Sequence, residues 1–305
     1  MEITDHIHSI PAPAGAGFYT GPQAPNVFLI SDGDEGALID SGFGDEKSVE
    51  ARLEFLRERP KVKVRHIVLT HHHFDHSSGA HQLREATGAQ VTLHADEVNF
   101  LRDWQSAAPQ DLEALAEQKE IAERIQKFRQ QAAEAGPDVR VADGDVVNVG
   151  GLTVEVVHTP GHTLGSVCLY LREERALFTG DTALGLGTVA ISPPPHGDMA
   201  LYLQSLERLK GYDCALMLPG HGQEVHDVSR KLQELIDHRL EREEQVLRLL
   251  ADGKRTPKEI LDVIYAELDK RIVPMALRQI EAHLAKLEAE GRVMRGGEGE
   301  WAPKG

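Results

Sequence analysis

One short segment, Thr70 to His76, constrains this chain more than any other part of its sequence. It reads THHHFDH, so four of the chain's 16 histidines and one aspartate fall within seven positions. A purification tag would be terminal and would lack the inserted Phe-Asp pair. Imidazole and carboxylate groups together suit zinc, iron or manganese better than calcium. The segment therefore predicts a metal site that other parts of the chain must complete.

The residues around this segment suggest how its side chains are arranged. Residues 64–70, VRHIVLT, predict a buried strand that leads into it. In an extended segment, side chains two positions apart point the same way, so His71 and His73 can reach one ion. His72 should then face away, and we interpret it as a spacer. Asp75 and His76 follow on an expected turn and could reach a second ion.

Three other junctions place a histidine or an aspartate after an apolar run and beside a glycine. They are His162 in VVHTPGHTLGS, Asp181 in LFTGDTALG and His221 in LMLPGHGQE. One cluster cannot complete two metal sites, so we expect ligands from other strand-to-loop junctions. A single junction of this kind would be unremarkable, but three of them together with the histidine segment predict a shared metal centre.

The pattern along the chain predicts an α/β fold in which two sheets lie between helical layers. Residues 26–40 read as two strands joined by an Asp/Gly turn, and strand and helix patterns then alternate to about residue 95. A strongly helical segment over 109–135 interrupts the strands, which return over 139–180. Alternating strands and helices are typical of layered α/β domains.

From about Gln233 the chain changes to helices and a small hairpin. The segment TPKEILDVIY predicts a helix that begins with a capping box and a proline in its first turn. The segment RVMRGGEGEWAP alternates around glycines and predicts a two-stranded wing. We therefore expect a catalytic domain over 1–232 and a winged-helix-like domain over 233–305.

Composition excludes some classes of protein. With 33 Lys and Arg against 49 Asp and Glu, the formal charge is −16, which disfavours a broad surface that follows nucleic-acid phosphates. The two cysteines lie in apolar runs, so we expect buried thiols and a reducing compartment rather than a disulfide. The first 15 residues lack the pattern of a secretion signal, and no apolar run reaches membrane-spanning length. We expect a cytoplasmic protein with no membrane association.

The histidine segment, together with His162, Asp181 and His221, resembles the ligand pattern of the metallo-β-lactamase fold superfamily. The resemblance covers about residues 20–227 and includes the opening hairpin, which ends at Asp40. It implies a four-layer αββα sandwich. It also implies that Asp40 supports the metal-binding loop without binding metal itself.

The resemblance further implies two Zn²⁺ ions per chain, with iron and manganese as the other metals that suit these ligands. The ligands of the first ion would be His71, His73 and His162. The ligands of the second ion would be Asp75, His76 and His221. Asp181 would bridge the two ions. A hydroxide between them would attack an ester, thioester, lactone, β-lactam or phosphodiester bond, and Asp75 would be the catalytic residue that orients it.

With its C-terminal helices, nearly the whole chain resembles the lactamase-beta-2-like group. That group includes an endoribonuclease of single-stranded RNA, and it also contains many hydrolases of unassigned substrate. Residues 240–305 hold 12 Lys and Arg against 13 Asp and Glu, which is less basic than a duplex-binding winged helix usually is. We therefore favour a small-molecule substrate over nucleic acid, and a C-terminal domain that covers the pocket or forms a homodimer.

Two other classes of function stay open on the sequence. A mononuclear iron enzyme of the persulfide-dioxygenase type uses part of the same ligand set, and metal analysis would identify it. A non-catalytic binding module would be expected to lose ligands, whereas this set is complete. His196, in the Pro-rich loop ISPPPHGD, and Ser166 are candidates for contact with the substrate.

Overall fold

The computed structural model describes residues 1–15, 24–103, 119–269 and 272–304. By their contacts these residues form two compact units, each with a hydrophobic core of its own. The first unit contains Met1–His158, Gly165–Gly187 and Asp213–Val228, and the second contains Thr159–Leu164, Thr188–Tyr212 and Ser229–Gly305.

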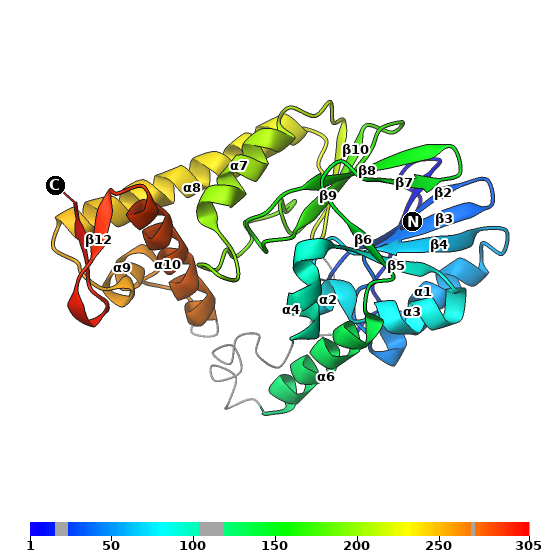
Figure 1. Ribbon diagram of the computed structural model, residues 1–305, viewed down its shortest axis with the longest axis horizontal. Coiled ribbons are helices and arrows are strands. Elements are labelled where there is room, and N and C mark those ends of the chain that lie inside the picture. Colours follow the sequence, from blue (N-terminus) through cyan, green and yellow to red (C-terminus); the bar gives the residue numbers. More distant parts are fainter. Residues whose placement is uncertain (16–23, 104–118, 270–271, 305) are drawn as a thin grey trace. The chain divides into compact units, whose positions relative to one another are not determined.

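A six-stranded sheet forms one half of the first unit (Figure 1). Its strands, in spatial order, are β1 Ile7–Ile10, β2 Val27–Asp32, β3 Glu35–Ile39, β4 Lys63–Val68, β5 Gln90–His94 and β6 Val139–Val141. Strands β1 to β3 pair antiparallel, and β3 to β6 pair parallel. The carboxyl ends of β3, β4 and β5 therefore meet at one edge of the sheet, where the predicted metal segment begins.

A five-stranded sheet forms the other half. Its strands, in spatial order, are β11 Leu216–Pro219, β10 Ala176–Gly180, β9 Val167–Leu171, β8 Leu152–His158 and β7 Val146–Val149. Strands β10 and β11 are parallel, whereas the other neighbours pair antiparallel. Because β10 and β11 run the same way, the two loops that follow them leave the sheet at the same edge.

Both faces of the six-stranded sheet are buried. Within β2, Phe28 and Ile30 contribute to an apolar cluster between the two sheets, whereas Val27 and Leu29 contribute to a cluster on the opposite face. This follows from the alternation of side chains along a strand. The helices that complete the second cluster are α1 Glu46–Arg57, α3 Ala80–Thr87, α4 Val98–Arg102 and α6 Lys119–Ala135. Burial of each such side chain contributes about 1.5–3 kcal/mol.

Local signals start and stop these helices as expected. The Asp45 side chain accepts a hydrogen bond from Ser48 N and caps α1. Gly88 ends α3 in the left-handed region, with φ of +72°. The helix predicted over 109–135 is seen as α6, and its first residues lie outside the described part of the chain.

Both cysteines are free. Cys168 is buried as expected, whereas Cys214 is only partly buried.

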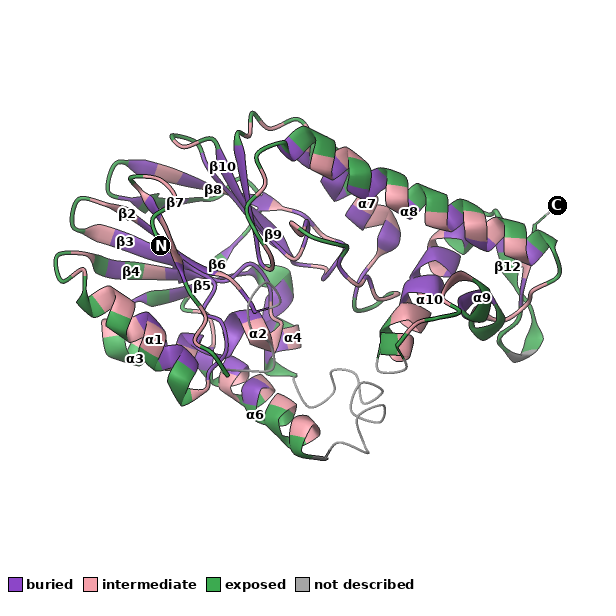
Figure 2. Ribbon diagram, turned by 180° about the vertical axis from the view of Figure 1, so that it is seen from behind, coloured by how far each residue is buried: buried purple, intermediate pink, exposed green. Residues whose placement is uncertain are grey.

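The second unit contains four longer helices and a small hairpin. They are α7 Met199–Leu209, α8 Val228–Ala251, α9 Pro257–Ile264, α10 Val273–Ala289, β12 Val293–Arg295 and β13 Trp301–Pro303. Along α8, buried and exposed residues recur on opposite sides, as Figure 2 shows. The predicted capping box of α9 is present, with Thr256 and Glu259 bonded to each other's backbone. Ile260, Leu284 and Trp301 belong to the core of this unit.

Helix α8 runs without a break through residue 233, so the predicted boundary between 232 and 233 falls inside a helix. The compact units also assign α7 and residues Thr159–Leu164 to the second unit. The boundary of the two domains stays a prediction. None of the described helices is long and apolar enough to cross a membrane.

Candidate metal centre

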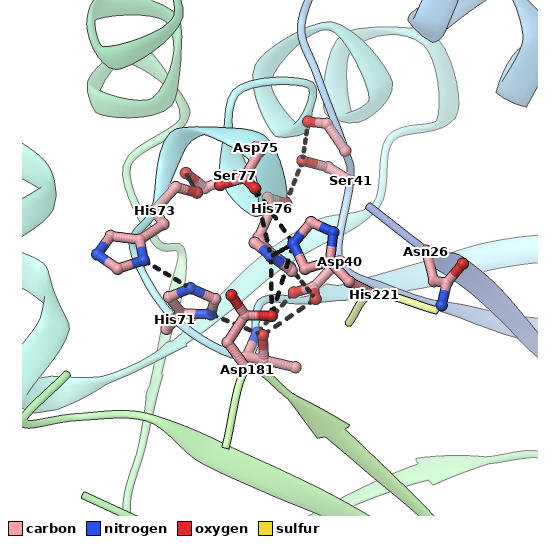
Figure 3. A network of polar contacts seen from close by, with 12 residues as sticks. Asn26, Asp40, Ser41, His71, His73, Asp75, His76, Ser77, Asp181 and His221 are labelled. Atoms are coloured by element: carbon pink, nitrogen blue, oxygen red, sulfur yellow. Dashed lines mark hydrogen bonds and ion pairs between the residues drawn. The ribbon is translucent and has the colours of Figure 1, made fainter. Parts of the chain in front are cut away.

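Six of the seven predicted ligands belong to the first unit, and they follow the ends of its strands. They are His71, His73, Asp75, His76, Asp181 and His221. Strand β4 precedes the first four, β10 precedes Asp181, and β11 precedes His221. The expected turn at Asp75 and His76 is a single turn of helix, α2 Phe74–Ser77. Figure 3 shows the imidazole rings and carboxylates of these residues turned toward one another.

His76 lies at the centre of the group. Its Nε2 is 3.7 Å from Asp75 Oδ2, 3.4 Å from Asp181 Oδ1 and 3.2 Å from His221 Nε2. His221 Nε2 is in turn 3.3 Å from Asp75 Oδ2 and 3.6 Å from Asp181 Oδ1. Two ligand atoms of one zinc ion can be at most about 4.2 Å apart. These separations therefore fit a common metal ion.

The other two histidines form a pair beside this group. His71 Nε2 is 3.0 Å from His73 Nδ1, and the two rings meet edge to face. The ring centroids of His71 and His76 are only 4.4 Å apart. The prediction that His71 and His73 face the same side is therefore confirmed, and their facing nitrogens could bind one ion.

His162 belongs to the second unit, where its ring is buried. Its Nδ1 donates a hydrogen bond of 2.9 Å to the carbonyl oxygen of Ala190. Because Nδ1 carries the proton, Nε2 is the nitrogen that could bind a metal. Its assignment to the same ion as His71 and His73 stays a prediction.

Asp40 fixes the orientation of the histidine loop. Its Oδ1 accepts a hydrogen bond of 2.7 Å from Thr70 N, and its Oδ2 lies 2.8 Å from His76 Nδ1 and 3.0 Å from Thr70 Oγ1. The side chain is buried, and the backbone has a φ of +58°, which is unusual for a residue other than glycine. This contact turns Nε2 of His76 toward the predicted ligands, as the resemblance implied.

His72 is bonded to Glu97 rather than to the predicted ligands, although its ring lies edge to face with that of His73, with centroids 4.8 Å apart. Its backbone N donates a hydrogen bond of 2.8 Å to Glu97 Oε2, and its ring Nδ1 bonds to the same oxygen. Phe100 stacks on the other side of the ring, with centroids 5.3 Å apart. Glu97 is fully buried, and its Oε1 also accepts from Gly165 N. Glu97 was not predicted as part of the site, since no motif in the sequence distinguishes it from a surface glutamate.

Asn26 and Gly220 determine how the backbone beside His221 is placed. Asn26 Nδ2 donates to the carbonyl oxygens of Pro219 and Gly222, and so holds the backbone on both sides of the histidine. A Cβ at Gly220 would lie 2.6 Å from Asp181 Oδ1 and 2.8 Å from a ring carbon of His76. Only glycine therefore lets β11 approach the ligands this closely. Asn26 lies in no motif that would have marked it as part of the site.

The charges of the site favour a bound cation. Burial lowers the pKa of His76, but Asp181, Asp75 and Asp40 outweigh burial and raise it to about 10. Burial likewise lowers the pKa of His221, and Asp181 and Asp75 raise it to a net value above the usual range. Burial raises the pKa of Asp75, but His76 and His221 hold it below the usual range. The three carboxylates thus need a positive charge among them, either as protons or as metal.

A further group, His94, Asp96 and His158, also brings its ligand atoms within 4.8 Å of one another. The rings of His94 and His158 are stacked, with centroids 4.2 Å apart and planes inclined by 14°. The nitrogen lone pairs of nearly parallel rings do not converge on one point. This group therefore does not form a metal site in its present arrangement.

Of the two residues predicted as candidates for contact with the substrate, Ser166 is buried and His196 is exposed.

Comparison with known proteins gives the family context of this geometry. Residues 20–221 match the family model of the metallo-beta-lactamase superfamily, and residues 256–301 match that of the beta-lactamase associated winged helix domain. The chain is similar to an atrochrysone carboxyl ACP thioesterase of Aspergillus fumigatus, at 29% identity over 92% of this chain and 81% of that protein. It is also similar to the beta-lactamase-like protein 2 homolog of Drosophila melanogaster, at 29% identity over 89% and 84% of the two chains.

A solved structure is similar to this chain over nearly its whole length. A metallo-beta-lactamase family protein from Thermus thermophilus superposes with a TM-score of 0.81 and 27% sequence identity. The match covers 99% of this chain and 100% of that chain. The predicted fold, an αββα sandwich followed by a winged-helix-like domain, is therefore confirmed.

Proposed function

Because the chain belongs to the metallo-β-lactamase superfamily and is a metal-dependent hydrolase, we propose that it uses two divalent metal ions, zinc first among them, to hydrolyse a thioester or a related activated acyl bond. The observation that carries this proposal is the convergence of Asp75, His76, Asp181 and His221 beside the His71–His73 pair. A single ion would use only part of this set.

The proposal gives each residue a distinct task. His71, His73 and His162 would hold one ion, Asp75, His76 and His221 would hold the second, and Asp181 would contribute to both. Divalent ions in such a site polarise the substrate carbonyl and make water a competent nucleophile near neutral pH. Asp40 keeps His76 in the ring orientation that presents Nε2.

Asp75 is proposed to orient the attacking water. Its Oδ2 lies beside both His76 and His221, so a water at this position would meet an acceptor of fixed direction. Its pKa lies below the usual range because His76 and His221 outweigh its burial, so it stays ionised near neutral pH. An ionised carboxylate accepts a proton or a hydrogen bond but donates none, which suits this role.

The choice of a thioester rests on the relatives. Two of them, from Aspergillus fumigatus and Emericella nidulans, are named atrochrysone carboxyl ACP thioesterases, and each aligns over 92% of this chain. Cleavage of single-stranded RNA is the second candidate. The chain's charge of −16 disfavours it, because a phosphodiester substrate gains affinity from basic surface.

Zinc-loaded protein assayed against a panel of substrates tests the proposal. The panel contains an acyl-N-acetylcysteamine thioester, a glutathione thioester, an acyl-homoserine lactone, nitrocefin, bis-p-nitrophenyl phosphate and a short single-stranded RNA, each with an EDTA control. We expect two zinc ions per chain and the highest kcat/KM on a thioester. Higher activity on RNA would support the second candidate, and one iron per chain would refute the hydrolytic centre.

Matched histidine variants test the site assignment. His73→Ala should lower kcat/KM by at least about 100-fold, since removal of a ligand costs more than the 10–100-fold typical of its supporting residues. His226→Ala, which removes an exposed histidine five positions after His221, should keep the wild-type rate. Full activity in His73→Ala would show that the reaction occurs elsewhere.

A further inference from the structure

Residues Val189–Ile191 of the second unit, called the strap here, connect the C-terminal helices to His162. We propose that Arg239 and Gln279 are positioning residues of the metal centre, which hold the strap so that it fixes the ring of His162. The inference rests on the proposed function, in which His162 binds a metal ion. It gives the C-terminal helices a task in catalysis that requires no nucleic acid.

Three hydrogen bonds carry the argument, and all three lie within the second unit. His162 Nδ1 donates to the carbonyl oxygen of Ala190, the middle residue of the strap, over 2.9 Å. On one side of Ala190, Arg239 Nη2 from α8 donates to Val189 O over 2.5 Å. On the other side, Ile191 N donates to Gln279 Oε1 from α10 over 3.0 Å. The two helices thus fix the backbone on both sides of the carbonyl that orients the histidine.

Arg239 and Gln279 are buried polar residues whose own packing does not explain them. Arg239 is only 2% exposed, and Gln279 is only 6% exposed. Arg239 Nε and Gln279 Nε2 have no hydrogen-bond partner among the described residues. A buried guanidinium without a carboxylate partner is destabilising, and an apolar side chain would usually pack in its place more favourably. Arg239 also lies over the ring of Tyr202, with its Cζ 5.3 Å from the ring centroid, but that contact pairs none of its N–H groups. Among the described residues, the hydrogen bonds of both side chains go to the strap.

Helix α7 holds the backbone of the His162 loop from another direction. Ser205 Oγ donates to Pro160 O over 2.8 Å, and Asp198 N donates to Gly161 O over 2.9 Å. Gly161 lies against this helix so closely that a Cβ would be 2.4 Å from Cα of Tyr202. With the loop backbone fixed by α7, rotation of the ring is the freedom that remains to His162.

The strap removes that freedom. Its carbonyl keeps the proton on Nδ1 and leaves Nε2 for the metal, which is how supporting acceptors orient metal-bound histidines in general. If Val189 or Ile191 lost its anchor, the carbonyl could shift, and His162 would spend part of its time in rotamers that cannot bind. The ion that His162 binds would then be held less tightly, while the other ion would be little affected.

Zinc affinity of variant proteins tests the inference. The two strap variants are Arg239→Met and Gln279→Leu, each close in volume to the residue it replaces. Arg242→Met is the matched control, because Arg242 lies one turn further along α8 and contacts Tyr265 and Gln245 instead of the strap. His162→Ala is the reference for loss of the ligand itself. Chelator competition gives the affinity of each zinc ion, and the absorption spectrum of the cobalt-substituted protein reports the ligand field.

We expect each strap variant to lower the affinity for one of the two zinc ions about tenfold. This is the lower end of the range for residues that support metal ligands. The cobalt spectrum should change in the same direction as in His162→Ala. Arg242→Met should keep both affinities within twofold of wild type, and Arg239→Lys should restore most of the loss. Thermal unfolding of the metal-free proteins shows whether a variant has lost its fold. If Arg239→Met has lost its fold, the zinc affinity of Gln279→Leu tests the inference instead.

The outcomes separate the inference from the proposed function. If both strap variants bind both ions within twofold of wild type while His162→Ala weakens one of them, the inference is wrong and the ligand assignment stands. If His162→Ala binds both ions as tightly as wild type, His162 is not a ligand and both proposals fail. If Arg242→Met loses as much zinc affinity as the strap variants, and each loss follows the loss of thermal stability, the role of Arg239 and Gln279 is structural and the inference fails.

Discussion

Replacement of His283 by leucine should make the second unit less sensitive to acid. His283 lies in α10, is fully buried, and has no hydrogen-bond partner for either ring nitrogen among the described residues. Burial, followed by the positive charges of Arg239, Lys286 and Arg242, lowers its pKa from 6.5 to about 3. The folded protein therefore keeps this imidazole neutral at a pH where the unfolded chain protonates it.

The size of the effect follows from the two pKa values. Because the folded pKa lies below the unfolded value, the unfolded state binds more protons between about pH 6.5 and pH 3. The contribution of His283 is thus fully present above pH 6.5 and is lost progressively as the pH falls through this window. Between pH 7 and pH 5 the loss amounts to about 2 kcal/mol of unfolding free energy, at about 1.4 kcal/mol per pH unit below the unfolded pKa.

Urea unfolding of the metal-free protein measures this quantity. Trp301 lies in the core of the second unit and reports its unfolding by fluorescence once Trp104 is replaced by phenylalanine. In this background His283→Leu should lose about 2 kcal/mol less than the parent between pH 7 and pH 5. Between pH 7 and pH 8.5 the two proteins should change in parallel, which serves as the internal control. Equal losses on acidification, within about 0.5 kcal/mol, would refute the reasoning.

Four further predictions concern the metal centre. Gly220→Ala places a methyl group against two ligands and should lose one zinc ion per chain by metal analysis, whereas Gly297→Ala, with open space around its Cβ, should keep both. Asp40→Asn weakens the bond that orients a ligand ring and should lower zinc affinity about 10–100-fold in chelator competition. Glu97→Gln places an amide against backbone donors and should cost about 1–3 kcal/mol in urea unfolding. Zinc affinity measured from pH 6 to pH 9 should rise with pH, because the carboxylates hold the pKa of His76 at about 10 and zinc must displace its proton. An affinity that is flat over that range would contradict the last prediction.

Much of the fold could be predicted from the sequence because its signals are local. Strand alternation, the left-handed glycine after α3 and the capping box of α9 depend on residues within a few positions of one another. The same holds for the facing rings of His71 and His73, which follow from their spacing after a strand. The predicted start of the C-terminal helices was less accurate, since α8 begins at Val228, before the expected change near Gln233.

The sequence by itself determined which side chains are candidates to bind metal, because imidazole and carboxylate groups that follow buried strands have the chemistry of metal ligands. It did not determine what holds them. Glu97 lies 25 positions from the histidine it fixes, and Asn26 lies 193 positions from the carbonyl of Pro219 that it holds. The strap acts through the backbone carbonyl of Ala190, and a carbonyl leaves no trace in residue type. Only the tertiary structure brings these distant groups within hydrogen-bonding distance, because such contacts depend on how sheets and helices pack rather than on any local pattern.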